Sequence, residues 1–265
     1  LSATGISKAG FDTNAYGLVM GYDRKFAGKS VILGGAFSYN HGSLDSTGDV
    51  LKTKNKYDSF GLHAYGAYAP VEKVNLIGTL SWMHNSSDIT QSINAAGFNK
   101  ADADVKTNLF SLGARAEANL PVGKANVIPH AGLRYVWAKS GSYDTKVDGK
   151  KVWGNTPDAT NTFQLPIGVA VRGDIMTVSG WNVRPQADLT FIPQFGDTEQ
   201  KTKLSNFNGI SDKLSGEFAG KFGTSVNLGV QADKGPTTFG VRYGFTAGTK
   251  GKADHAFKFE YRYRF

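Results

Sequence analysis

The last nine residues, Phe257-Lys258-Phe259-Glu260-Tyr261-Arg262-Tyr263-Arg264-Phe265, alternate aromatic and charged side chains at every position. Because successive side chains of a β-strand point to opposite faces, this stretch predicts a strand with one apolar face and one ionic face. The apolar face includes tyrosine, which is enriched at membrane–water interfaces. We therefore expect a strand that separates lipid from a polar interior.

The same two-residue period recurs along most of the chain. It predicts strands near residues 1–10, 13–24, 30–41, 56–69, 73–86, 110–117, 127–137, 163–172, 181–191, 222–231, 238–245 and 257–265. Most are longer than the roughly 5–6 residues of globular strands and suit the roughly 9–11 residues of a tilted membrane strand. The sequence thus predicts an all-β fold, a single domain over residues 1–265 that forms a 12-stranded antiparallel transmembrane β-barrel.

Four prolines fall inside these predicted strands, at Pro129, Pro166, Pro185 and Pro193. Proline cannot donate a hydrogen bond to the ladder, so we expect bulges near strand ends at these positions.

The connections between these segments are of two kinds. Joins near 24–29, 69–73, 120–125, 173–180 and 232–236 are short, whereas joins near 41–56, 86–104, 139–161 and 195–217 are long and polar. Outer-membrane barrels combine short periplasmic turns with long external loops. We therefore expect both termini in the periplasm of a Gram-negative bacterium and the long loops outside the cell.

Aromatic residues are expected near both ends of the strands. Tyr22, Phe26, Tyr68, Trp181, Phe239 and Phe265 fall near the short turns, and Tyr39, Tyr57, Trp82, Trp137, Phe163, Phe191 and Phe257 fall near the long loops. Two such belts are typical of membrane barrels, in which they lie at the two interfaces.

Composition narrows the function classes. The chain has 265 residues, a net charge of +8 and no cysteine, which excludes disulfides, thiolate zinc sites and a cysteine nucleophile. It contains no stretch of about 18 consecutive apolar residues that would predict a transmembrane helix. Lysine and arginine recur singly along the chain, which is not typical of a nucleic-acid-binding patch, so no nucleic-acid partner is expected.

The charged faces of the predicted strands would line the barrel interior. The expected lumen-lining residues are Arg115, Glu117, Arg134, Arg172, Arg184, Asp188, Arg242, Lys258, Glu260, Arg262 and Arg264. One interpretation is a hydrated, salt-bridged wall, in which Glu117, Asp188 and Glu260 are the candidate partners. The other is a cationic conduit for an extended chain, which would also favour anions over cations.

Glycines recur on the same predicted faces, at Gly17, Gly21, Gly61, Gly113, Gly132, Gly168, Gly229 and Gly240. They leave room for a polypeptide inside the barrel or allow the wall to bend, and the sequence does not separate these two explanations.

An enzymatic reading rests on one cluster, in which His84 precedes Ser86, Ser87 and Asp88. No hydrolase motif surrounds it, and the five histidines show no metal-ligand spacing. We therefore expect no catalytic residues, no metal and no cofactor.

The segment Tyr16–Arg24 resembles the second barrel strand of type V autotransporters, and the Gly34–Tyr39 segment and the aromatic strand that ends at Phe265 resemble the same family. The resemblance covers essentially the whole chain and implies a C-terminal translocator domain that delivers an N-terminal passenger to the cell surface. It implies an assembly signal at Phe257, Phe259, Tyr261, Tyr263 and Phe265, although Glu260 stands where the family's signal usually has glycine. It also implies contact with the barrel assembly machinery and with outer-membrane lipid and lipopolysaccharide.

The alternative functions are a stand-alone porin or surface adhesin of the same architecture. The chain begins within the pattern at Leu1, so we expect a mature fragment or the C-terminal part of a longer precursor.

Overall fold

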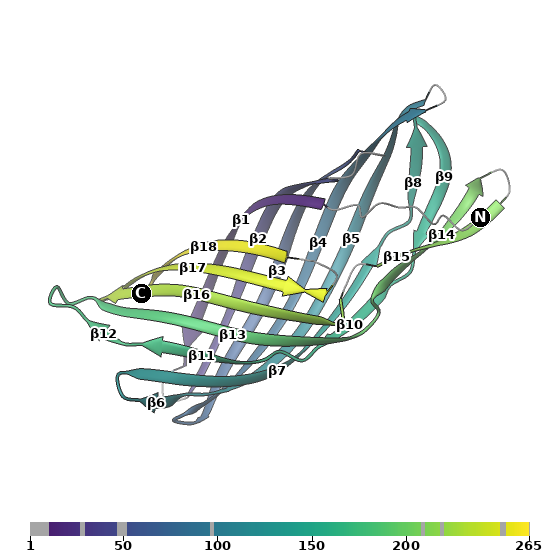
Figure 1. Ribbon diagram of the computed structural model, residues 1–265. Coiled ribbons are helices and arrows are strands. Elements are labelled where there is room, and N and C mark those ends of the chain that lie inside the picture. The colour runs from purple at the N-terminus through teal and green to yellow at the C-terminus, as the bar shows by residue number, and fades with distance from the viewer. Residues whose placement is uncertain are drawn as a thin grey trace.

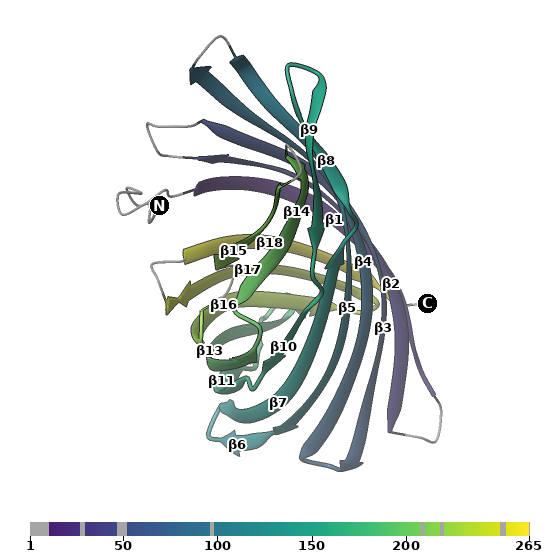
Figure 2. The same cartoon turned by 90° about the vertical axis from the view of Figure 1, so that its right-hand side faces the viewer.

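The computed structural model describes residues 11–26, 30–46, 52–95, 98–207, 210–217, 220–249 and 253–264. Its strands are β1 (Phe11–Lys25), β2 (Val31–Ser46), β3 (Thr53–Val71), β4 (Val74–Ala95), β5 (Phe98–Ala118), β6 (Leu120–Val122), β7 (Ala125–Ser140), β8 (Tyr143–Val147), β9 (Lys150–Pro157), β10 (Thr160–Gln164), β11 (Ile167–Gly173), β12 (Ile175–Met176), β13 (Asn182–Gly196), β14 (Glu199–Phe207), β15 (Ile210–Glu217), β16 (Phe222–Lys234), β17 (Thr237–Gly248) and β18 (Ala253–Tyr263). All join one sheet, which curves strongly (Figures 1 and 2). The described part of the chain has no helix long and apolar enough to cross a membrane.

The long arms of the sheet are β1, β2, β3, β4, β5, β7, β10 with β11, β13, β16, β17 and β18, each antiparallel to the next. β10 and β11 form one arm because both pair with β7 and with β13 in a common register. The all-β fold follows the prediction. The strand predicted over residues 1–10 lies outside the described residues, so the count of twelve stays a prediction.

The short connections lie where the sequence predicts them, but the long ones differ from the prediction. β4 continues to Ala95 and β5 begins at Phe98, so most of the predicted loop 86–104 is a two-stranded extension of the sheet. The predicted loops 139–161 and 195–217 likewise contain the hairpins β8–β9 and β14–β15. These extensions rise beyond the ends of β7 and β13 in Figure 1. Their ladders continue although the sequence no longer alternates between apolar and polar residues.

The prolines within the arms do not produce the expected bulges. Pro129 pairs with Val169 and Pro185 with Val230, in ladders that show no register shift. Leu165 and Pro166 separate β10 from β11, yet the register against both neighbours is the same before and after them. The ladder therefore loses a donor at each proline and keeps its register.

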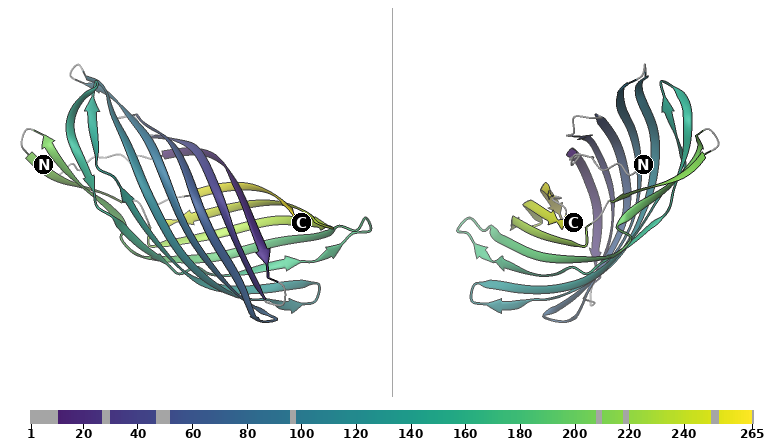
Figure 3. Two further views of the ribbon diagram at one scale, coloured as in Figure 1. Left: turned by 180° about the vertical axis from the view of Figure 1, so that it is seen from behind. Right: turned by 45° about the vertical axis from the view of Figure 1, so that its right-hand side comes forward.

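The strands β1 and β18 are the two edges of the described sheet. β1 pairs with β2 and β18 pairs with β17, and no ladder joins β1 to β18 among the described residues. The edges approach each other on the side of the short turns, where Arg262 Nη2 of β18 lies 4.0 Å from Asp23 Oδ2 of β1. The right-hand view of Figure 3 shows the resulting trough, open toward the opposite end.

Candidate functional site

The two faces of the sheet differ in chemistry. Residues opposite each other in a ladder share a face, and the registers place Ser38, His63, Arg134, Asp188 and Arg242 together on what we call the polar face. All of the polar residues buried in the described chain lie on this face: Ser38, Ser59, Ser87, His130, Asn155, Thr160, Thr162, Thr190, Asp233 and Thr238. Most exposed large apolar residues of the arms lie on the other face, which we call the apolar face. Side chains crowd together on the concave side of a curved sheet. The burial of these residues therefore agrees with the polar face being the concave side.

The registers place ten of the predicted lumen residues on the polar face: Arg115, Glu117, Arg134, Arg172, Arg184, Asp188, Arg242, Lys258, Glu260 and Arg262. Arg264 follows the end of β18, and its backbone N–H donates to the carbonyl of Pro236. Whether these residues line a closed lumen stays a prediction.

Two of the three predicted acidic partners pair with arginine. Arg115 Nη2 lies 3.1 Å from Glu117 Oε2, and Arg262 Nη2 lies 3.4 Å from Glu260 Oε1. In each pair the two residues lie two positions apart on the same strand, so the ion pair runs along the arm. Both side chains of the second pair are about half exposed, and such pairs contribute roughly 1 kcal/mol or less.

The third predicted acid, Asp188, pairs with a histidine. His130 Nε2 on β7 lies 2.8 Å from Asp188 Oδ2 on β13, and Thr190 Oγ1 donates to Asp188 Oδ1 at 2.7 Å. The His130 side chain is only 1% exposed. This cluster ties β7 to β13 across β11, because Gly168 and Ala170 of β11 stand between them without large side chains.

Arg184 joins a second cluster that the sequence did not indicate. Its Nη2 lies 2.8 Å from Asp233 Oδ2 and its Nε donates to Asp174 Oδ1 at 3.2 Å. Thr238 Oγ1 donates to Asp233 Oδ1 at 2.9 Å. The only available sequence signal was the position of these carboxylates at strand ends that flank short turns.

Four of the predicted lumen residues have no carboxylate within 4 Å among the described residues: Arg134, Arg172, Arg242 and Lys258. Arg134 Nε donates to Ser111 Oγ at 3.1 Å. When the Gln186 amide is oriented with its oxygen toward Arg242, it accepts from Nε at 3.1 Å and Nη2 at 2.8 Å. The polar face therefore carries positive charge that no carboxylate neutralises, and neutral partners orient Arg134 and Arg242.

Neighbouring groups of the wall fill the space beside several of the glycines. A Cβ at Gly61 would lie 2.7 Å from Ser38 Oγ and 2.9 Å from His63 Nε2, and one at Gly113 would lie 2.6 Å from Thr79 Oγ1. Near Gly34, a glycine outside the predicted set, the Tyr65 ring occupies the corresponding space. These glycines make room for side chains of adjacent strands.

The predicted assembly residues of β18 lie on the apolar face. Phe257, Phe259, Tyr261 and Tyr263 are 79%, 71%, 56% and 47% exposed, and Phe265 lies outside the described residues. Tyr261 packs on Phe239 of β17 with ring centroids 5.3 Å apart. The edge strand β18 thus presents an exposed row of aromatic side chains.

Aromatic rings on the apolar face meet near both ends of the arms. Near the extensions Trp82 contacts Phe60 with centroids 5.6 Å apart, and near the short turns Trp181 lies 6.2 Å from Phe239. Tyr57 was expected in the outer belt, but its register opposite Gly42 places it on the polar face, where its ring lies over that glycine.

Among the described residues, no hydrogen bond or ion pair joins His84 to Ser86, Ser87 or Asp88. His84 lies on the apolar face, where its Nδ1 contacts Asn108 Oδ1 at 2.9 Å and its ring packs on Phe60 and Trp82. Ser87 lies on the opposite face and accepts a hydrogen bond from Asn85. In the described part of the chain, no group of three or more histidine, aspartate or glutamate side chains could hold a metal ion.

Comparison with known proteins gives one family and one fold. The family model described as the autotransporter β-domain matches residues 3–244. The β domain of the Bordetella autotransporter BrkA is similar over 96% of this chain and 92% of its own, with 19% identity and a TM-score of 0.68. The translocator domain of NalP from Neisseria meningitidis is similar over 96% and 82% of the two chains (18% identity, TM-score 0.68). The transport unit of AIDA-I from Escherichia coli is similar over 96% and 84% (15% identity, TM-score 0.66). No curated protein matches the chain.

Proposed function

Since this chain belongs to the autotransporter β-domain family, we propose that it carries its N-terminal passenger to the cell surface along the polar face of its curved sheet. The family is one of translocator domains that deliver a passenger polypeptide and lie in the Gram-negative outer membrane. The path along the polar face, the closed lumen and the placement in the bilayer are our proposals.

The observation that carries the proposed path is the chemistry of the polar face. A passing polypeptide in an extended form exposes backbone N–H and C=O groups, which need polar partners or water. The polar face offers hydroxyl, amide and guanidinium groups along its whole length, whereas large apolar side chains gather on the other face. A chain that moves over such a surface meets few apolar side chains on which to stick.

The basic residues without acidic partners give this surface positive charge that no carboxylate compensates. Arg134, Arg172, Arg242 and Lys258 come from four arms, β7, β11, β17 and β18, and have no acidic partner within 4 Å among the described residues. A ring of such charges inside a pore favours anions. We propose that the lumen is a cationic conduit and not a neutral, fully salt-bridged wall.

The proposed placement sets the apolar face against lipid. The short turns and both termini then lie in the periplasm, and the hairpin extensions lie outside the cell. The aromatic strand β18 would be recognised by the barrel assembly machinery during insertion, with outer-membrane lipid and lipopolysaccharide as the surrounding partners. We expect no enzymatic activity, cofactor or nucleic-acid partner.

Planar-bilayer conductance of the folded chain tests the conduit. We expect a small anion-favouring pore that closes when a synthetic helical peptide matching the native upstream linker is added. A steady pore that ignores the linker would instead support a stand-alone porin, and absence of any pore would support a structural or adhesive barrel.

A further inference from the structure

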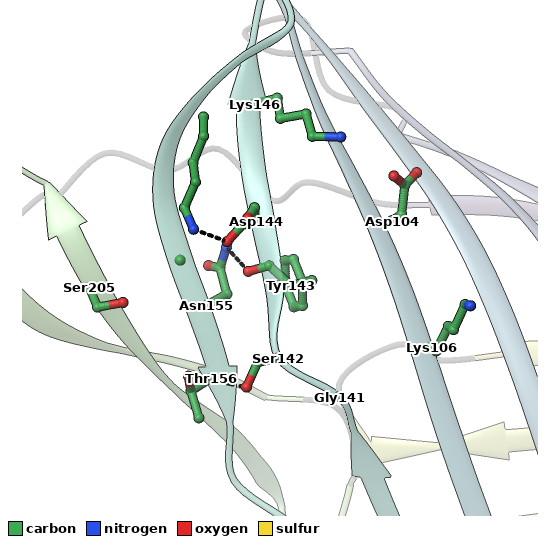
Figure 4. A pocket seen from close by; sticks show the side chains of 12 residues that line it. Asp104, Lys106, Gly141, Ser142, Tyr143, Asp144, Lys146, Asn155, Thr156 and Ser205 are labelled. Carbon is green, nitrogen blue, oxygen red and sulfur yellow. Dashed lines mark hydrogen bonds and ion pairs between the residues drawn. The ribbon is translucent and has the colours of Figure 1, made fainter.

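The sheet opens between β5 and β8, beyond the end of the long arms. The β5–β7 ladder ends at Thr107 and Ser140, and the β5–β8 ladder starts again at Ala103 and Thr145. Between these points β5 and the chain after β7 separate around a hollow of about 550 Å³, part of whose lining is labelled in Figure 4.

Lysines gather around this opening on the apolar-face side of the sheet. Lys106 lies on the same face of β5 as Phe110, and Lys146 shares that face because it pairs beside Asp102. Lys151 lies opposite Lys146 in the β8–β9 ladder. Lys203 of β14 shares the face too, since it stands opposite Thr156 of β9. Four strands, β5, β8, β9 and β14, therefore contribute one ammonium group each.

Among the described residues, only one of these four lysines has a carboxylate partner. Lys151 Nζ lies 2.8 Å from Asp144 Oδ1, which is the one ion pair within the hollow's described lining. Lys106 and Lys146 have no carboxylate within 4 Å among the described residues, although Asp104 lies between them in Figure 4. Both lysines are exposed. They are free to bind an external anion.

Polar neutral groups complete the lining. Ser142 Oγ donates to Thr156 Oγ1 at 3.3 Å, and the Asn155 amide donates to Thr145 Oγ1 at 2.8 Å. Partial burial raises the pKa of the Tyr143 phenol, which therefore keeps its donor hydrogen. Hydroxyl and amide groups of this kind suit sugar hydroxyls as well as phosphate oxygens.

The position of Lys106 relative to a row of aromatic rings indicates how far the site lies from the hydrocarbon of the membrane. Trp82, Phe110 and Trp137 stand opposite one another on β4, β5 and β7 and form a row across the apolar face. Lys106 lies four residues beyond Phe110, on the side of the extensions. At about 3.4 Å per residue and a tilt near 40°, this places it about 10 Å above the row. Aromatic rows mark the edge of the hydrocarbon, and the headgroups lie directly above them.

We propose that the lysines Lys106, Lys146, Lys151 and Lys203 form a binding site for the phosphate groups of an outer-leaflet phosphorylated glycolipid. This inference rests on the proposed placement of the apolar face against lipid. The charge fits the anionic headgroup, the depth fits its phosphates, and the hollow can accept its sugar. A lipid is favoured over a soluble anion because the lysines continue a face that is apolar below them, where acyl chains would lie.

The variant Lys106→Gln/Lys146→Gln tests the site, since it removes the two lysines without acidic partners. The matched control is Lys54→Gln/Lys56→Gln, which removes the same charge from the same face of β3 at the same rim. The probe is bisphosphorylated lipid A, titrated onto the detergent-folded full chain and followed by native mass spectrometry. A parallel titration uses lipid A from which the phosphates have been removed.

Each lysine near a membrane surface contributes about fivefold in affinity, so the double variant is expected to bind lipid A about 30-fold more weakly. The control variant should change by less than about threefold, and the dephosphorylated lipid should bind the unmodified protein as weakly as lipid A binds the variant. Equal losses in both variants, or equal binding of the dephosphorylated lipid, would overturn the inference. Competition by millimolar inorganic phosphate that abolishes lipid binding would reassign the site to a soluble anion.

Display of a surface passenger separates this inference from the proposed function. A chain that displays its passenger but binds lipid A equally well with and without the lysines contradicts the lipid site alone. Failure of display with lysine-dependent lipid binding contradicts the translocator path and leaves the lipid site standing.

Discussion

Gly168 shows how closely groups pack on the polar face. A Cβ there would meet the carbonyl oxygen of Leu189 and lie 2.7 Å from His130 Cε1. At Gly78, on the apolar face, an added Cβ would meet no atom within 4 Å. Neighbouring atoms therefore exclude a side chain at Gly168 but leave room for one at Gly78.

We expect Gly168→Ala to destabilise the folded chain by about 1–3 kcal/mol, because the His130–Asp188 cluster and the β13 backbone must move. Gly78→Ala should be neutral or stabilising by up to about 1 kcal/mol, since alanine loses less backbone entropy than glycine. Urea midpoints of the two variants, read from heat-modifiable mobility on gels, make the comparison. Equal destabilisation would contradict the packing described here.

His130→Leu tests the cluster that ties β7 to β13. The substitution leaves Asp188 with the Thr190 hydroxyl and without its histidine partner, so we expect a loss of about 1–3 kcal/mol in unfolding free energy. His84→Leu is the matched control on the apolar face and should cost less than about 1 kcal/mol. An equal effect of both substitutions on the urea midpoint would show that the Asp188 contact does not stabilise the sheet.

The residue-level prediction from sequence succeeds where strand parity is sufficient. Alternation along one strand assigned Arg115, Arg134 and Arg242 to one face, and the registers agree. It did not identify Asp233 as the partner of Arg184, because a cross-strand contact depends on the register between segments far apart in sequence. Tyr57 was misplaced for a related reason: polar residues surround it, so its parity could not be read from the pattern.

At the scale of elements, the arms were predictable and their extensions were not. In the proposed placement, one face of each arm meets lipid within the bilayer, so its sequence alternates between apolar and polar residues and predicts a strand. In the same placement the extensions meet water on both faces, and hydrogen bonding between strands needs no apolar residue. The segments 86–95 and 98–104 continue the β4–β5 ladder with mostly polar side chains, and for this reason they read as a loop.

The β14–β15 hairpin should be dispensable for folding of the arms. It pairs with itself and with β9, and β9 in turn belongs to another extension. Replacement of residues 199–217 by a short glycine–serine loop is expected to leave a folded, heat-modifiable protein. The same replacement of residues 143–157 removes the other hairpin as a comparison. Loss of the folded form in these variants would show that the extensions nucleate the sheet.

At the scale of the whole molecule, charge on the polar face defines the expected pore. Arg115 and Arg184 are neutralised by carboxylates, whereas Arg134, Arg172 and Arg242 are not. Exchange of the second set for glutamate should reverse the preference for anions in a bilayer measurement of reversal potential. The control variant Lys54→Glu/Lys56→Glu on the apolar face should keep the preference for anions. Unchanged selectivity in the triple variant would contradict the cationic conduit.

Surface display of a reporter tests whether this domain delivers a passenger across the outer membrane. An epitope-tagged reporter is placed behind a signal peptide and joined through a helical linker ahead of residue 1, and intact cells are treated with protease. We expect protease to remove the tag from intact cells while the folded domain remains in the outer-membrane fraction. A tag that stays protected until the outer membrane is opened, with the domain folded and inserted, would contradict it.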